Sequence, residues 1–330
     1  MTSLYITEAG AYLHKRGGHV VVGRNQEVIL EVPLEKVEDV YLIDSVQISS
    51  SLMVELIKRE IPLSWLSTRG TFYGSLINTG FVDVMKHLQQ VRLLEEKFFY
   101  LSLSKKLIVA KINNQLTILR RYNRTIESRT IEQAIGNIIS VRKSLLRSHT
   151  SNELIGYEGL ISRLYFQCLG EIVPEPFTFT KRSKHPPLDP VNSLLSLGYS
   201  MLFNEILAGV IATGLHPYIG CLHKPKKGHA ALVSDLIEEW RAPIIDSMVL
   251  SMLKRNMIGY DQFLMEEDGC YLSPEARKIF LLAYNQKIKS SNKYFGTDMT
   301  YRACIKKQIA AYSRAVMNEC VGDYQPVELR

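Results

Sequence analysis

The chain has 330 residues, of which 46% are hydrophobic and 22% charged, as expected for a globular protein of about two domains. Its five cysteines are scattered and never spaced as CxxC, which argues against a disulfide framework and against a cysteine-rich zinc site. The N-terminus lacks a basic start followed by an apolar run, so we expect no secretory signal and a cytoplasmic location. The most apolar segment, residues 194–215, has Asn204 and Glu205 at its centre, which favours a buried core helix over a membrane span.

Positive charge is concentrated in one part of the chain. The net charge is +7, but residues 86–147 alone hold thirteen Lys or Arg against four Asp or Glu, a balance of +9. A solvated surface can also be basic without binding anything. A basic segment of about sixty residues with helical periodicity nevertheless favours an extended polyanion such as nucleic acid over a small substrate.

The N-terminal part predicts short β-strands. Segments rich in β-branched and aromatic residues alternate with turn signals such as Gly17–Gly18. The expected strands are residues 4–7, 11–15, 19–23, 27–32, 39–43, 62–66 and 71–77. Residues 50–60 begin with serines and repeat apolar residues at helical spacing, which predicts one helix. We therefore expect a β-rich domain over residues 1–83, with a scaffold or dimerisation role and no catalytic constellation.

From Met85 onward the periodicity becomes helical, with apolar residues recurring every three or four positions. Further helices are expected at residues 131–147, 153–169, 192–212 and 231–255. Residues 171–192 hold five of the twelve prolines and predict a long loop, whose basic cluster suits either phosphate contacts or a solvated linker. We therefore expect an α+β protein in which residues 84–330 form an all-α catalytic domain that ends in a frayed tail.

An acidic helical turn follows a loop that contains His223. Asp235 shares one face of the expected helix with Glu238 and Glu239, and such carboxylates repel one another unless they are solvated or share a cation. Solvation is the ordinary explanation. Two features of the preceding loop favour metal binding: it contains His223, and its lysines Lys224, Lys226 and Lys227 suit a phosphate backbone.

Glu158 lies in an otherwise apolar helical segment, residues 154–166, where a half-buried carboxylate requires a partner. Arg163 is one candidate partner, and a divalent cation shared with the acidic turn is the other. A site of one imidazole and two carboxylates suits Mg²⁺ or, better, Mn²⁺, because imidazole is a poor Mg²⁺ ligand. Together with the basic helices, such a site favours cutting or joining of nucleic acid.

Several segments, in their order along the chain, resemble motifs of one known family, the CRISPR adaptation endonuclease/integrase that inserts new spacers. The resemblance covers essentially the whole chain. The matching segments are "SKKLIVAKINNQLTILRR", "YEGLISRLYF", "PPLDPVNSLLSLGYSML", "GLHPYIGCLH" and "SDLIEEWRAPIID".

The resemblance implies a catalytic and metal-binding set of Glu158, His223 and Glu238, where the third position is Asp in some relatives. It places assisting residues nearby, which are Asp235, Asn192, Tyr165 and Arg241. DNA contacts are expected from Lys181, Arg182, Lys184, Lys224, Lys226 and Lys227. The "KHPP" segment, which contains Lys184 and His185, departs from the basic and aromatic residues expected in some relatives.

The resemblance also implies an N-terminal β-sandwich-like domain, homodimers formed through it, and a hetero-hexamer with a small ferredoxin-like partner protein. The implied reaction is attack of a DNA 3′-hydroxyl on a phosphodiester at the leader–repeat junction, with Mg²⁺ or Mn²⁺ as cofactor, double-stranded DNA as substrate and no membrane involvement. Two alternatives remain open: a stand-alone metal-dependent nuclease on branched DNA, and a non-catalytic DNA-binding scaffold.

Overall fold

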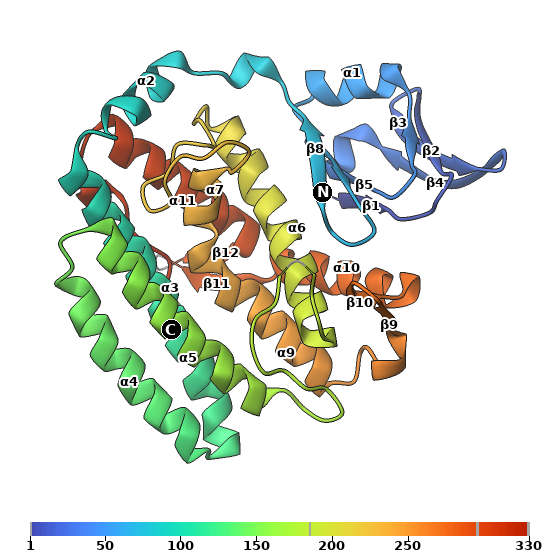
Figure 1. Cartoon of the computed structure of the whole chain (residues 1–330). Helices are drawn as coiled ribbons and strands as arrows, with labels where there is room; N and C mark the ends of the chain where they lie inside the picture. Colours follow the sequence, from blue (N-terminus) through green and yellow to red (C-terminus); the bar gives the residue numbers. More distant parts are fainter. Residues whose placement is uncertain (1, 185, 295–296, 329–330) are drawn as a thin grey trace. The chain divides into compact units, whose positions relative to one another are not determined.

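A computed structural model of the chain describes residues 2–184, 186–294 and 297–328 (Figure 1). The chain divides into two compact units, residues 1–81 and 82–330, and each is described by itself. The division falls close to the boundary after residue 83 that the change of periodicity indicates.

The N-terminal unit is built from two four-stranded sheets and one helix. One sheet has the order β1-β5-β7-β8, with β1 and β7 parallel to β5 and with β8 antiparallel to β7. The other has the order β4-β3-β2-β6, in which only the β2–β6 pair is parallel. The strands are β1 Thr2–Ile6, β2 Tyr12–Arg16, β3 His19–Arg24, β4 Glu27–Pro33, β5 Val37–Ile43, β6 Gln47–Ile48, β7 Leu63–Leu66 and β8 Phe72–Leu76.

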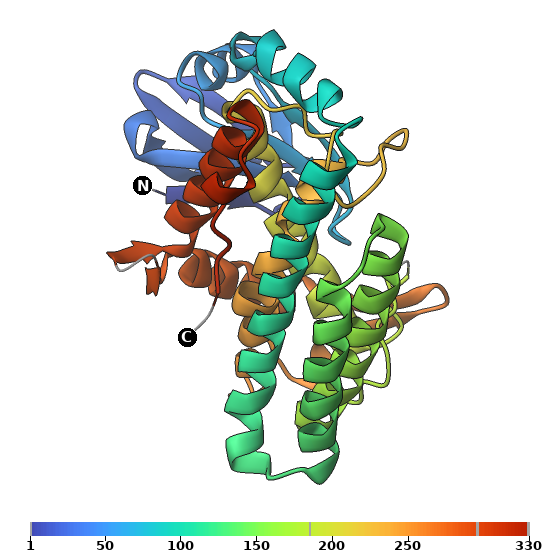
Figure 2. The ribbon, with the colours of Figure 1, turned by 90° about the vertical axis from the view of Figure 1, so that its left-hand side faces the viewer.

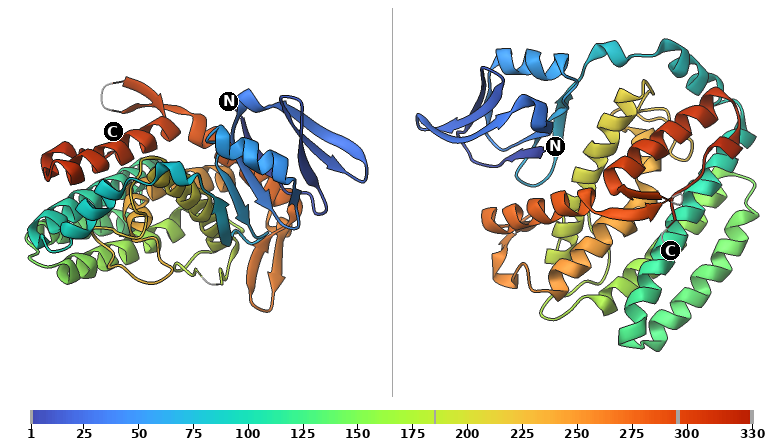
Figure 3. Two further views of the ribbon diagram at one scale, coloured as in Figure 1. Left: turned by 90° about the horizontal axis from the view of Figure 1, so that it is seen from above. Right: turned by 180° about the vertical axis from the view of Figure 1, so that it is seen from behind.

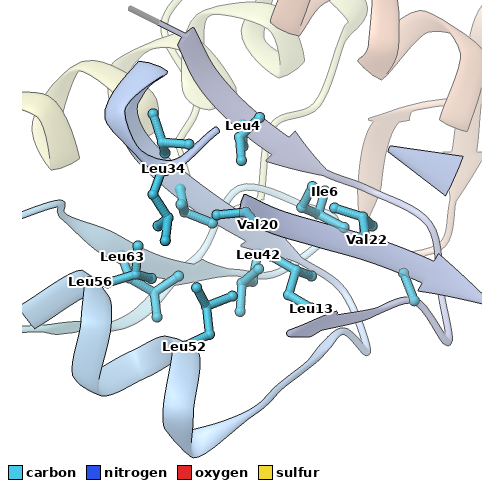
Figure 4. Packing of buried hydrophobic residues seen from close by; sticks show 13 residues of the cluster. Leu4, Ile6, Leu13, Val20, Val22, Leu34, Leu42, Leu52, Leu56 and Leu63 are labelled. Carbon is cyan, nitrogen blue, oxygen red and sulfur yellow. The ribbon is translucent and has the colours of Figure 1, made fainter. Parts of the chain in front are cut away.

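Aliphatic side chains from both sheets and from α1 (Ser50–Lys58) form the core of this unit (Figure 4). Leu4 and Leu42 come from one sheet, Leu13 from the other, and Leu52 from α1. The helix begins where the Ser49 hydroxyl accepts a hydrogen bond from the Leu52 amide, as the serines in the sequence predict. The expected β-sandwich-like domain is confirmed.

The second unit is mostly helical. Its helices are α2 Val84–Arg92, α3 Lys97–Ile126, α4 Arg129–Leu146, α5 Ser151–Ile172, α6 Pro190–Ala212, α7 Ala231–Leu236, α8 Glu238–Trp240, α9 Ser247–Lys254, α10 Pro274–Lys289 and α11 Tyr301–Met317. Helices α3, α4 and α5 lie side by side (Figure 2). Thr150 caps α5 and Asp189 caps α6, where Pro190 occupies the first turn.

The expected helical unit is confirmed, and it also contains two antiparallel hairpins, β9 (Phe263–Glu266) with β10 (Gly269–Leu272) and β11 (Ser291–Tyr294) with β12 (Thr297–Thr300). One expectation for this unit is wrong. The described part of the tail is not frayed, because Tyr324 and Val327 are fully buried.

Helix α6 is long and apolar enough to cross a membrane by length and composition, but 61% of its most apolar window is buried within the unit. It is the core helix that the central Asn204 and Glu205 indicate, and Glu205 is paired with Arg302 at 2.7 Å.

Candidate metal-binding and catalytic site

A cavity of about 680 Å³ in the helical unit brings together residues that are far apart in the sequence. Lys111 reaches it from the middle of α3, Glu158 from α5, and Glu238 from α8. His223 reaches it from the loop before α7, and Arg241 from the π-helical segment Arg241–Asp246. The three residues expected to be catalytic, Glu158, His223 and Glu238, therefore line one cavity.

A lysine joins the two glutamates. The ammonium of Lys111 donates a hydrogen bond to Glu158 Oε1 and lies 2.6 Å from Glu238 Oε2. The hydroxyl of Ser162, one turn along α5, donates to the same Glu158 oxygen at 2.7 Å. Among the described residues, Glu158 pairs with Lys111 and not with Arg163, the partner considered from the sequence, although Arg163 lines the same cavity.

The charges in this cluster compensate one another despite their burial. Burial opposes ionisation of Glu238, yet the nearby Arg241 and Lys111 together lower its pKa to about 2. Burial likewise opposes the charge on Lys111, but Glu238 and Glu158 outweigh it and raise the pKa of the ammonium. Arg241 completes the set with a contact of 3.1 Å from its Nε to Glu238 Oε1. Glu238 is therefore held as a carboxylate at neutral pH.

His223 is held in place by Asp235, which is fully buried. Its Nδ1 lies 2.6 Å from Asp235 Oδ1, and the carboxylate also accepts hydrogen bonds from the backbone amides of Cys221, Leu222 and His223 at 2.6, 3.0 and 3.0 Å. The hydrogen bond to Asp235 is the largest cause that raises the pKa of His223. Gly220 allows the loop to pass this close to the Asp235 carboxylate, because a Cβ at position 220 would lie 2.3 Å from Asp235 Oδ2.

The donor set fits a divalent cation. In the described ranges no three His, Cys, Asp or Glu side chains already form a metal cluster, and the Lys111 ammonium lies between the two carboxylates instead. Glu238 Oε2 is buried and, within those ranges, accepts no hydrogen bond of suitable geometry. An Nδ1–H that donates to Asp235 leaves the Nε2 lone pair of His223 available as a ligand. Two carboxylates and one imidazole facing one cavity suit Mn²⁺ or Mg²⁺.

The C-terminal segment holds the helix that carries Glu238, through hydrogen bonds to the neighbouring Glu239. The neighbour of Glu238, Glu239, is fully buried and accepts hydrogen bonds from the Tyr324 hydroxyl and, at 2.9 Å, from the Val327 amide. Asn114 on α3 donates to the carbonyl oxygens of Glu239 and Val327, both at 2.9 Å. The segment after α11 therefore connects α8 to α3 through hydrogen bonds. This segment lies beside α3 (Figure 3).

Asp246 is a second buried carboxylate at the cavity wall. It accepts hydrogen bonds from the hydroxyls of Tyr165 at 2.7 Å and Tyr199 at 2.5 Å. Burial raises its pKa to about 6, although these hydrogen bonds partly oppose the shift. The guanidinium of Arg241 stacks 4.5 Å from the centre of the Tyr199 ring. Tyr165 and Arg241 therefore belong to the surroundings of the site, as the resemblance implies.

The remaining expected residues divide into supporting and exposed positions. Asn192 is buried and holds the loop before α6, because it binds the Arg182 guanidinium, the Ser183 amide and the Lys181 carbonyl. Lys181, Arg182 and Lys184 line the cavity, whereas Lys224 lines a neighbouring cavity of about 240 Å³ that also contacts His223. Lys226 and Lys227 are exposed and line neither cavity. His185 lies outside the described residues.

Lys111, Ser162, Tyr199 and Asp246 are site residues that the sequence reasoning missed. Lys111 had one available signal: it lies between buried apolar residues on α3, where an unpaired lysine is unfavourable. Asp246 follows Pro243 in a helical run that forms a π-helical segment, and nothing in the residue pattern marks it.

Comparison with known proteins identifies the family. The family model described as CRISPR associated protein Cas1 matches residues 4–286. The CRISPR-associated endonuclease Cas1 of Mycobacterium tuberculosis is 31% identical over 325 residues, which covers 96% of this chain and 94% of the relative. The CRISPR-associated endonuclease Cas1 3 of Thermus thermophilus is 31% identical over 331 residues, covering 99% and 97%. The chain belongs to the Cas1 family.

Solved structures share the fold. A CAS1 protein from Thermotoga maritima matches with a TM-score of 0.82 at 20% identity, over 96% of this chain and 97% of that one. A casposase bound to an integration product matches with a TM-score of 0.85 at 19% identity, over 98% and 95%. These likenesses extend over both units and include the helical unit that carries the cavity.

Proposed function

We propose that this chain is a divalent-metal-dependent DNA endonuclease and integrase that inserts new spacer DNA into a CRISPR array. The observation that supports this most is the meeting of Glu158, His223 and Glu238 at one cavity. The cavity wall also carries six Lys or Arg residues against three carboxylates, which suits a phosphate backbone. Among the neighbours of this fold, the casposase is bound to an integration product, and a further neighbour is a chain of a Cas6-RT-Cas1–Cas2 complex, 36% of which is covered by the match.

Glu158, His223 and Glu238 would hold one Mg²⁺ or Mn²⁺ ion. When bound, that ion would polarise a phosphodiester and stabilise the charge that builds on its oxygens. Arg241 and the basic residues of the 181–184 loop would position the phosphate, and Asp235 would keep the His223 ring oriented. The 3′-hydroxyl of the incoming DNA forms one P–O bond while the target strand's P–O bond breaks, so the exchange requires no nucleotide cofactor.

The assembly that we propose follows the family. The N-terminal unit would form a homodimer, two dimers would flank a dimer of a small ferredoxin-like protein, and the complex would bind duplex DNA in the cytoplasm. The two relatives compared above are named endonucleases. A Cas1–Cas2 complex among the structural neighbours is consistent with a protein partner.

A strand-transfer assay tests the reaction type. A labelled duplex with 3′-hydroxyl ends, incubated with Mn²⁺ and a repeat-bearing plasmid, is expected to become joined to the plasmid, whereas a duplex with 3′-dideoxy ends is not. Hydrolysis without joined product would instead support the branched-DNA nuclease.

The scaffold alternative makes a different prediction. Glu158→Ala, His223→Ala and Glu238→Ala would each leave every DNA activity intact if the acidic helix were only solvated. Loss of strand transfer in each variant, with retained DNA binding in a filter or gel-shift assay, would exclude the scaffold.

A further inference from the structure

Lys111 occupies the position where the two proposed carboxylate ligands meet. Its side chain is buried, with 8% of its surface exposed, and its ammonium contacts Glu158 Oε1 and Glu238 Oε2. We propose that Lys111 is a displaceable counter-ion, which holds the two carboxylates together in the metal-free protein and leaves them when a divalent cation binds. This inference rests on the proposed metal-dependent function.

The geometry makes the two cations mutually exclusive. A divalent ion approaches carboxylate oxygens to about 2.0–2.6 Å, closer than an ammonium, and it requires the same lone pairs that now face Lys111. Apart from the Lys111 ammonium, Glu238 Oε2 has no hydrogen-bond partner in the described ranges. A divalent ion that binds this oxygen therefore competes with Lys111. An ion bound to both glutamates therefore takes the place of the ammonium.

The charge balance points the same way. Without metal, the two negative charges of Glu158 and Glu238 are matched by Lys111 and Arg241, which are both within ion-pair distance of Glu238. A divalent ion added to this buried cluster with Lys111 still in place would leave an excess of two positive charges at low dielectric. Movement of the ammonium away from the carboxylates weakens its repulsion with the divalent ion, and a bound DNA phosphate would offset positive charge that remains in the cavity.

A place for the displaced ammonium exists one turn along α3. Gln115 lies four residues after Lys111, so the two share a helix face, and both line the same cavity. Gln115 Oε1 is buried and has no hydrogen-bond partner in the part of the chain that the structure describes. The ammonium can therefore exchange a carboxylate for this amide oxygen without leaving the cavity, or it can contact a phosphate there.

This exchange has a measurable consequence. In the metal-free protein, loss of Lys111 removes the cation that contacts both carboxylates and leaves buried Glu238 with Arg241 as its ion-pair partner among the described residues, which lowers stability. For metal binding, the same loss removes a competitor. Lys111→Met, which keeps most of the side chain's length, is therefore expected to melt at lower temperature in EDTA and to bind Mn²⁺ more tightly, by roughly tenfold or more.

The test measures the melting temperature of the full chain in EDTA and in Mn²⁺, together with Mn²⁺ affinity by calorimetry. Lys105→Met is the matched control, because Lys105 lies on the same helix but reaches the exposed Leu146 carbonyl at 3.1 Å. It is expected to match the wild type in both measurements. Lys111→Arg keeps a cation that binds carboxylates more firmly, so it is expected to fold normally and to bind Mn²⁺ more weakly.

The outcomes separate this inference from the proposed function. If the wild type binds no Mn²⁺, or binds it equally after Glu238→Gln, the proposed metal site fails. If the wild type binds Mn²⁺ at this site and Lys111→Met binds it no more tightly, only the displacement inference is overturned. Should Lys111→Met fail to fold, unchanged or tighter Mn²⁺ binding by Lys111→Arg overturns it equally.

Discussion

His223 Nδ1 lies 2.6 Å from Asp235 Oδ1, and the carboxylate of Asp235 is completely buried beneath the loop that carries His223. The same carboxylate accepts three backbone amide hydrogen bonds from this loop. Asp235 therefore sets both the path of the loop and the orientation of the imidazole.

Asp235→Asn tests this relationship. The amide group presents N–H donors toward backbone N–H groups, so at least one loop hydrogen bond is lost and an unpaired donor is buried. We expect the free energy of unfolding to fall by about 2–3 kcal/mol, with Mn²⁺ affinity and strand transfer reduced together. Urea denaturation and Mn²⁺ calorimetry check this, and a variant with wild-type stability and affinity would contradict it.

Gly220→Ala tests the close approach of the loop to Asp235. An added Cβ would lie 2.3 Å from Asp235 Oδ2 and 2.8 Å from the Ala231 carbonyl carbon, so the loop must shift. We expect a loss of strand transfer larger than the loss of stability, since the shift moves His223 directly. Gly156→Ala is the control, because a Cβ at that position of α5 meets nothing within 4 Å and alanine favours a helix.

Tyr324→Phe tests the support that the C-terminal segment gives to the site. The hydroxyl donates to the buried Glu239 and accepts from Gln308 at 3.1 Å, and its removal leaves both groups with one partner fewer. We expect the free energy of unfolding to fall by about 1–3 kcal/mol. Tyr73→Phe, at a side chain that is 72% exposed, is expected to change nothing. Equal stability of the two variants would show that the segment is dispensable.

Asp246 predicts a specific pH dependence of stability. Burial raises its pKa from 3.8 to about 6, so its folded-state pKa lies above the unfolded value. The resulting stabilisation is complete below about pH 4 and is lost as the pH rises through about 6, a change of up to about 3 kcal/mol. Asp246→Asn resembles the protonated acid and lacks this change.

The check is urea denaturation of wild type and Asp246→Asn between pH 4.5 and 7.5. The variant is expected to gain stability relative to the wild type as the pH rises across this range. A constant difference between the two proteins would show that Asp246 titrates at an ordinary pKa.

Sequence patterns predicted those helices and strands that depend on interactions between residues close together in the chain, such as strand alternation and helix capping. The alternation of β-branched residues located the longer N-terminal strands, and serines or prolines located helix starts such as those of α1 and α6. The two-residue strand β6 and the two hairpins of the helical unit are too short to give a periodic signal. The tail was misjudged because its anchoring depends on Glu239, a residue distant in sequence whose side-chain direction no pattern reveals.

The candidate site was predictable only in part. Glu158 and His223 stand out because a polar residue in an apolar helix, or a histidine in a lysine-rich loop, is locally unusual. Their shared cavity with Glu238 agrees with the expectation, while their role as ligands stays a prediction. The pairing of Lys111 with both glutamates depends on how α3 packs against α5 and α8, which no single segment determines.

A crystal structure of the full chain grown with Mn²⁺, using anomalous scattering at the manganese edge, tests the central claim most directly. We predict one anomalous peak in contact with Glu158, Glu238 and the Nε2 atom of His223, with the Lys111 ammonium moved away from the carboxylates. The absence of a peak between these residues at saturating Mn²⁺, with Lys111 still joining Glu158 and Glu238, would contradict both the metal site and the mechanism built on it.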